Sequence, residues 1–183
     1  MNALAGIERT DFGQILVDGK VAKRTFFTTE VGYLPDKLDL YDYLTLQENI
    51  DFVLKVRELE NDETKRYLAE LLVELELADQ LKTRLKDLSK GMRQKFNFIV
   101  TILHRPKLLL FDGLDPKQIM VLKNLLRKLV KQGTVVIFSS HILSFVTDLC
   151  NKVIFIAAGR LQKQLEGKVT EKDLMVLFNE IKD

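Results

Sequence analysis

Cysteine, tryptophan and proline are scarce in this sequence of 183 residues, which contains one cysteine, no tryptophan and three prolines. Because Cys150 is the only cysteine, the chain cannot form an internal disulfide, and we expect no disulfide-linked partner. Such cysteine usage is typical of a protein in a reducing compartment.

Long hydrophobic runs and an excess of one charge are also missing. No apolar run approaches the roughly 18 residues that a membrane-spanning helix needs. The start of the chain, MNALAGIERT, lacks the basic-then-apolar pattern of a secretion signal. The 28 basic and 26 acidic residues are interspersed, which does not favour a nucleic-acid partner. We therefore expect a cytoplasmic protein that reaches a membrane only through a partner.

The second half of the chain alternates between short apolar segments and helical patterns. KLLLF (107–111), TVVIFSS (134–140) and KVIFIA (152–157) are nearly all apolar, as parallel strands buried on both faces are. A helical pattern lies between the first two, so the alternation predicts a parallel α/β sheet. A hairpin is expected after Gly159, and Thr170 is expected to cap a terminal helix.

The first half begins with turn and hairpin signals. Residues 1–6 are expected to end a helix at Gly6. QILVDGKVAKRTFF (14–27) predicts two strand-like runs joined by an Asp18-Gly19 turn. A short strand over 30–35 should follow.

A helical block comes next. Thr45 and Glu48 predict a capping box for a helix through about Arg57. Asn61 or Asp62 is expected to cap the following helix, whose leucines lie on one face.

A serine and a glycine stand where a further helix begins, in DLSKGMRQKF (87–96). Ser89 is a good N-cap, and the helix is expected to run to about His104, before Pro106. Gly91 lies in the first turn, where glycine weakens a helix by roughly 1 kcal/mol relative to alanine. A hydroxyl, a missing side chain and a free helix N-terminus together form a candidate anion site.

Four stretches then occur in a recognisable order: VGYLPDKLDLYDYLTLQENI (31–50), LSKGMRQ (88–94), LLLFDGLDP (108–116) and SSHIL (139–143). In this order they resemble the nucleotide-binding ATPase subunit of ATP-binding-cassette (ABC) transporters, most of all the separate ATPase subunits of bacterial exporters. The resemblance covers essentially all 183 residues. It implies an α/β fold with a P-loop-NTPase-like parallel sheet core, an N-terminal antiparallel β hairpin and an inserted α-helical subdomain. Residues 1–40 and 90–183 would form the ATPase core, and residues 41–89 the helical signature subdomain.

The resemblance also implies a role for each motif. In the family, the signature motif clasps the γ-phosphate of ATP bound to the opposite subunit of a dimer. Here it corresponds to Leu88, Ser89, Lys90, Gly91, Met92, Arg93 and Gln94. The D-loop, which crosses the dimer interface, corresponds to Gly113, Leu114, Asp115 and Pro116. Asp112 ends the Walker B strand as the expected Mg²⁺ ligand, and His141 matches the catalytic switch histidine. His104 lacks such a context and is expected to be an ordinary helix-end residue.

The chain departs from the family pattern in three places. It contains no G-x-x-x-x-G-K-S/T phosphate loop, and residues 1–6 resemble the end of the helix that follows that loop. Phe111-Asp112 runs directly into Gly113, so the glutamate that acts as general base in the family is absent. Asp36 stands in the position of the Q-loop glutamine.

The expected function is therefore that of an ABC ATP-binding subunit with ATP and Mg²⁺ as cofactors. Its expected partners are a transmembrane permease and a second ATPase subunit, in a homo- or heterodimer, and it would power export from the inner face of the membrane. The chain is expected to be N-terminally truncated and unable to hydrolyse ATP alone. The alternative is a non-catalytic interaction module, a pseudo-ATPase that binds a membrane subunit or a partner ATPase.

Overall fold

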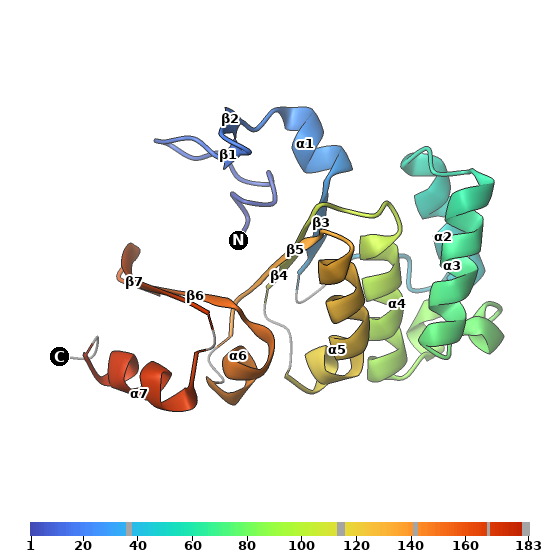
Figure 1. The fold of residues 1–183 in the computed structure, drawn as a ribbon. Helices are drawn as coiled ribbons and strands as arrows, with labels where there is room; N and C mark the ends of the chain where they lie inside the picture. Colours follow the sequence, from blue (N-terminus) through green and yellow to red (C-terminus); the bar gives the residue numbers. More distant parts are fainter. Residues whose placement is uncertain (36–37, 113–115, 141–142, 168, 181–183) are drawn as a thin grey trace.

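A three-stranded parallel sheet forms the centre of the computed structural model (Figure 1). Its strands are β3 (Val31–Leu34), β4 (Leu108–Phe111) and β5 (Val135–Phe138), hydrogen-bonded in this order. The structure describes every residue except 36–37, 113–115, 141–142, 168 and 181–183. The parallel α/β sheet predicted from the sequence is present in β3, β4 and β5.

Helices flank the sheet and fill the segment between β3 and β4. The longer ones are α2 (Leu46–Val56), α3 (Asp62–Glu74), α4 (Lys90–Ile102), α5 (Pro116–Lys131) and α7 (Glu171–Glu180). The shorter ones are α1 (Arg24–Thr29), α6 (Leu143–Leu149) and the 3-10 helices η1 (Ala78–Gln80) and η2 (Leu85–Asp87).

The helix caps agree with the sequence. Thr45 and Glu48 form the predicted capping box at the start of α2, and Asn61, rather than its neighbour, caps α3. At α7 the Asp173 carboxylate accepts hydrogen bonds from the backbone N–H and the hydroxyl of Thr170. Each cap satisfies N–H groups that the first turn of a helix leaves without a partner.

The N-terminal region differs from the prediction in two ways. Residues 1–6 form turns rather than a helix, although Gly6 does adopt the left-handed backbone expected of it, with φ of +72°. A Cβ at Gly6 would lie 2.6 Å from the Phe27 side chain, so only glycine fits there. The hairpin has only two residues in each strand, β1 (Leu16–Val17) and β2 (Lys20–Val21). The rest of the predicted second run folds as α1, where Phe27 packs onto the sheet.

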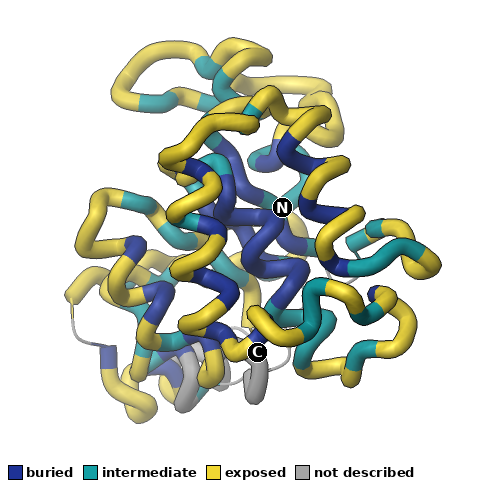
Figure 2. The backbone as a smooth tube through the Cα atoms, turned by 90° about the vertical axis from the view of Figure 1, so that its right-hand side faces the viewer, coloured by how far each residue is buried: buried dark blue, intermediate teal, exposed yellow. Residues whose placement is uncertain are grey.

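The two faces of the sheet bury different residues, as the period of two in a strand requires. Leu109 and Phe111 of β4 belong to the main core, which continues through α2, α3, α4 and α5. Leu110 faces the other way and joins a small cluster with Ala5 and α1. Figure 2 shows buried segments running through the middle of the molecule with exposed segments around them.

The strands beyond β4 are less buried than predicted. β6 (Lys152–Ala157) pairs antiparallel with β7 (Arg160–Glu166) in a separate sheet, which confirms the hairpin after Gly159 but corrects the prediction of a parallel strand. Residues alternate between exposed and half-buried along both β5 and β6, so neither is buried on both faces. The reason is that, within the described segments, helices cover only one side of these two strands.

Candidate functional site

The start of α4 is built as the sequence predicts. Ser89 adopts an extended backbone, and its hydroxyl accepts a hydrogen bond from the Met92 N–H at 3.2 Å. Leu88 and Met92 are half-buried against the main core and hold the turn in place. Ser89, Lys90 and Gly91 are exposed. This turn therefore presents its hydroxyl and its backbone N–H groups to whatever approaches from outside.

Charge at this helix start suits an anion. Acidic side chains stabilise a helix N-terminus, but the first turn of α4 contains none and carries Lys90 instead. An added Cβ on Gly91 would meet no atom within 4 Å, so the fold itself does not require glycine there. A ligand that approaches the backbone closely would require it.

Arg93 links this turn to the segment before α2. Its guanidinium forms an ion pair with Asp42 at 2.6 Å, and the Asp42 carbonyl accepts a hydrogen bond from the Lys86 N–H at 3.0 Å. Both side chains of the ion pair are partly exposed, so the pair orients Arg93 more than it stabilises the fold. Gln94, the last predicted signature residue, is half-buried in the same turn.

A second polar cluster lies where the parallel strands end. Asp112 follows β4, its N–H donates to the Leu34 carbonyl at 3.1 Å, and its carboxylate accepts a hydrogen bond from the Ser139 hydroxyl at 3.2 Å. The carboxyl ends of parallel strands are the usual position of ligands in such sheets. The structure thus joins Asp112 to Ser139 of the SSHIL stretch.

Two further residues of this cluster were not predicted as site residues. The Tyr33 hydroxyl donates to the Asn2 side-chain oxygen at 3.0 Å. Burial raises the pKa of Tyr33, and the nearby negative charge of Asp112 raises it further. Tyr33 lies within the quoted VGYLP stretch, but only the parallel register of β3 and β4 brings it to Asp112.

Several predicted site residues fall outside the described part of the chain. These are Asp36, the D-loop residues Gly113, Leu114 and Asp115, and the switch histidine His141. Pro116 is the first residue of α5, a position that suits proline because it has no N–H to leave unpaired. The roles assigned to these residues remain predictions.

His104 does more than end a helix. Its Nδ1 lies 2.8 Å from the Arg57 guanidinium and its Nε2 lies 3.1 Å from the Val31 carbonyl. These contacts define a neutral ring that donates from Nε2 to the carbonyl and accepts from Arg57 at Nδ1. Burial, followed by the Arg57 charge, lowers the pKa of His104 to about 4. The ring therefore joins the helical segment to β3, which no local sequence signal indicates.

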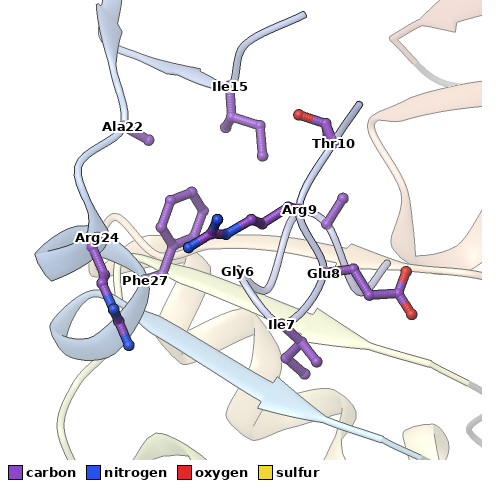
Figure 3. A pocket seen from close by; sticks show the side chains of 10 residues that line it. Gly6, Ile7, Glu8, Arg9, Thr10, Ile15, Ala22, Arg24 and Phe27 are labelled. Carbon is purple, nitrogen blue, oxygen red and sulfur yellow. The ribbon is translucent and has the colours of Figure 1, made fainter. Parts of the chain in front are cut away.

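A surface hollow lies elsewhere, between the N-terminal segment and α1. It has a volume of about 570 Å³, and Figure 3 shows the side chains of Arg9 and Phe27 pointing toward one another across it. Neither Asp112 nor any residue of the Ser89 turn lines it. The candidate site therefore lies at the Ser89 turn and at Asp112, where the residue types suit an anion and a metal ion, and not at this hollow.

Comparison with known proteins identifies the family. The model of the family described as ABC transporter matches residues 1–114, more than half of the chain. The chain belongs to the ABC transporter family. The matched residues include the Ser89 turn and Asp112, and the predicted family resemblance is confirmed.

Individual relatives agree with this assignment. The ABC transporter ATP-binding protein YhaQ of Bacillus subtilis is 30% identical over 148 residues, covering 79% of this chain and 49% of that protein. The linearmycin resistance ATP-binding protein LnrL of the same species is 30% identical over 167 residues, covering 88% of this chain and 54% of that protein. This chain thus spans about half the length of these relatives.

A solved ATP-binding subunit of an ABC transporter has the same fold. It superimposes with a TM-score of 0.80 at 26% identity, over 100% of this chain and 77% of that chain. Within the described segments, no helix is long and apolar enough to span a bilayer.

Proposed function

We propose that this ABC chain contributes its signature turn, residues 88–94, to ATP held by a second ATPase subunit. The observation that carries the proposal is the exposed Ser89 turn, with its open space at Gly91 and its basic first turn. A γ-phosphate fits such a turn, because backbone N–H groups and a helix N-terminus favour an anion.

The 183 residues do not provide a complete nucleotide site of their own. They contain no G-x-x-x-x-G-K-S/T loop, so the backbone cradle and the lysine for the phosphates are both missing. Asp112 is followed by Gly113 rather than by a glutamate that could serve as general base. Phosphoryl transfer depends on positioning and on cationic stabilisation of the phosphates, so we expect no hydrolysis by these residues alone.

The cluster at the end of β4 fits a partial Mg²⁺ site. Mg²⁺ prefers oxygen ligands and keeps several waters and phosphate oxygens, so one carboxylate and one hydroxyl suffice from the protein. Asp112 and Ser139, 3.2 Å apart, would hold the ion there. When bound, Mg²⁺ would neutralise charge on the phosphates. Asp112 and Ser139 orient one another for that task, while Tyr33 keeps its proton and donates to Asn2.

An exposed aromatic face is the proposed contact with a membrane permease. Tyr41 and Phe52 meet edge to face with their ring centres 4.9 Å apart, and Tyr43 is 76% exposed beneath the Lys86 ammonium. Val56, one turn after Phe52, is also exposed. Aromatic side chains grouped on a surface are typical of protein–protein contacts. This face would hold the chain at the cytoplasmic side of the membrane. The likeness to LnrL, a resistance protein by name, favours export as the direction of transport.

Substitution on this face tests the docking proposal. The chain is expressed together with its permease, and its recovery with membrane vesicles from these cells is measured. Phe52→Glu and Tyr43→Glu should each reduce this recovery at least about tenfold, because a charge would enter an apolar contact. Val73→Glu is a matched control, since Val73 is exposed on α3 outside this face. Equal loss in the control, or unchanged recovery of the Phe52 and Tyr43 variants, contradicts the proposal.

Association with a complete ATPase subunit tests the shared nucleotide site. The chain and Bacillus subtilis LnrL are mixed and followed by sedimentation velocity with and without Mg-ATP. The proposal predicts a heterodimer that forms only with Mg-ATP and is lost in Gly91→Asp, which puts a carboxylate where the phosphate would lie.

A non-catalytic interaction module is the second candidate. The aromatic face of Tyr41, Tyr43 and Phe52 favours it, because docking there needs no nucleotide. Association with LnrL or with the permease that is the same with and without Mg-ATP would support this candidate over a shared nucleotide site.

A further inference from the structure

Three side chains form a hydrogen-bonded network between the N-terminal segment and β3. The Tyr33 hydroxyl donates to Asn2 Oδ1 at 3.0 Å, and Asn2 Nδ2 donates to Glu8 Oε1 at 2.9 Å. Tyr33 and Asn2 are half-buried, whereas Glu8 is exposed. We call Tyr33, Asn2 and Glu8 the tyrosine network.

Glu8 fixes the direction of both hydrogen bonds. An ionised carboxylate has no proton to donate, so the Asn2 amide must turn its NH₂ group toward Glu8 and its oxygen toward Tyr33. Tyr33 must then donate to Asn2. Because a phenol has a single proton, the Tyr33 oxygen can act toward any further neighbour only as an acceptor.

Tyr33 lies on the same face of the sheet as Asp112. Tyr33 is the register partner of Leu110 and packs with it in the small cluster around Ala5. Asp112 follows Leu110 by two residues, which is one period of a strand, and its N–H continues the ladder by donating to the Leu34 carbonyl. The negative charge of Asp112 is also close enough to raise the pKa of Tyr33. Both oxygens accept hydrogen bonds, so a donor is needed to join them.

A water molecule bound to a metal ion suits this place. Mg²⁺ at Asp112 and Ser139 would keep several of its waters, and a bound cation makes the protons of these waters better donors. Groups that accept hydrogen bonds from outside the inner coordination sphere orient the ligands of a metal ion and strengthen its binding. An accepting oxygen beside Asp112 would serve in this way.

We propose that Tyr33 is a positioning residue of the metal site, which accepts a hydrogen bond from a water bound to Mg²⁺ at Asp112, and that Asn2 and Glu8 hold it in this accepting state. The inference rests on the Mg²⁺ site proposed above for Asp112 and Ser139. It makes Glu8, an exposed carboxylate that does not contact the ion, a determinant of the affinity for the ion.

Terbium luminescence tests this proposal on the full 183-residue chain. Tb³⁺ prefers oxygen ligands as Mg²⁺ does, and a nearby tyrosine sensitises its luminescence. The chain contains no tryptophan, and its other tyrosines, Tyr41, Tyr43 and Tyr67, lie in the helical segment between β3 and β4. Luminescence excited through tyrosine should therefore saturate with Tb³⁺, and Asp112→Asn should abolish it.

A nearly isosteric variant of Glu8 reverses the network. The Gln side chain of Glu8→Gln can donate to the Asn2 oxygen, so the amide can turn round and Tyr33 can donate to Asp112 in competition with the ion. The luminescence midpoint should move to an at least about threefold higher Tb³⁺ concentration. Asp11→Asn is the matched control, because it removes an exposed carboxylate from the same segment without touching the network, and it should change the midpoint less.

A second measurement covers Tyr33, whose removal also removes the sensitiser. Electron paramagnetic resonance of free Mn²⁺ needs no tyrosine, and it should show at least about threefold weaker Mn²⁺ binding in Tyr33→Phe than in the native chain. Thermal unfolding of each variant shows whether the fold is retained.

The outcomes separate the network from the metal site. Absence of saturable luminescence in the native chain means that Asp112 binds no metal ion, which overturns the proposed site and this inference together. Luminescence that Asp112→Asn abolishes, but that Glu8→Gln leaves unchanged, keeps the site and overturns the inference alone. Equal weakening by Glu8→Gln and Asp11→Asn also overturns the inference, because charge alone would then explain the effect.

Discussion

His104 is the residue whose chemistry depends most on the fold. It accepts a hydrogen bond from Arg57 and donates one to the Val31 carbonyl, and both bonds need the neutral ring. Its pKa is lowered from 6.5 to about 4, so the folded chain resists protonation at a pH where the unfolded chain does not. Protonation would leave two cations facing one another beside a buried carbonyl.

The stability of the fold should therefore fall in mild acid. Above pH 6.5 the ring is neutral in both states, whereas between pH 6.5 and about 4 only the unfolded state takes up the proton. Lowering the pH from 7 to 5 should reduce the free energy of unfolding by about 2 kcal/mol. Urea unfolding at both pH values measures this difference.

A histidine-free variant isolates the effect. His104→Gln keeps a donor and an acceptor but does not titrate, so most of the loss between pH 7 and pH 5 should disappear. An unchanged pH dependence in this variant would show that other groups cause the loss.

The fold does not require glycine at position 91, on our account. Nothing lies within 4 Å of the position its Cβ would take, and glycine weakens a helix relative to alanine. Gly91→Ala should therefore raise the free energy of unfolding by roughly 0.5 kcal/mol. Chemical denaturation checks this, with Gly32→Ala as the contrasting variant, since a Cβ there would lie 2.8 Å from the Thr101 carbonyl and should destabilise. Destabilisation by Gly91→Ala would mean that the fold itself needs this glycine.

Among the elements, α4 depends on its first turn. The Ser89 hydroxyl accepts a hydrogen bond from the Met92 N–H, and the first turn contains no acidic side chain that could stabilise it instead. Ser89→Ala should lower the free energy of unfolding by about 1 kcal/mol, while Ser89→Asn, which also caps, should lower it by much less. Equal unfolding midpoints for the native chain and the alanine variant would show that the cap contributes nothing.

Elements whose signals are local could be predicted from the sequence, and elements that depend on distant partners could not. The capping box of Thr45 and Glu48 and the Asp18-Gly19 turn need only neighbouring residues, and both are present. KVIFIA has the composition of a parallel strand, but its pairing depends on which strand lies beside it, and among the described residues that strand is the antiparallel β7. RTFF has the residues of a strand, yet packing of Phe26 and Phe27 on the sheet favours a helix.

The candidate site also contains residues that local sequence signals predict and residues that only the fold brings together. Its motif residues, Ser89 and Asp112, could be recognised because their spacing is local. The contributions of Tyr33 and Asn2 could not be predicted. Tyr33 reaches Asp112 only through the parallel register of β3 and β4, and Asn2 reaches Tyr33 only through the turns before α1.

At the scale of the whole molecule, the chain combines the exposed Ser89 turn with the absence of a G-x-x-x-x-G-K-S/T loop from its 183 residues. A complete site would need the loop, Mg²⁺ and the signature of another subunit around one nucleotide. These 183 residues present Ser89 outward but hold only Asp112 and Ser139 for the metal. On our proposal, these residues complete a site on another subunit rather than hold a nucleotide alone.

A calorimetric titration of the purified 183-residue chain with Mg-ATP tests this claim most directly, with Mg²⁺ alone and Asp112→Ala as controls. Our account predicts no saturable heat up to millimolar ATP, because no backbone cradle receives the phosphates. Saturable binding that Asp112→Ala removes would contradict it, since the chain would then hold its own nucleotide without a phosphate loop.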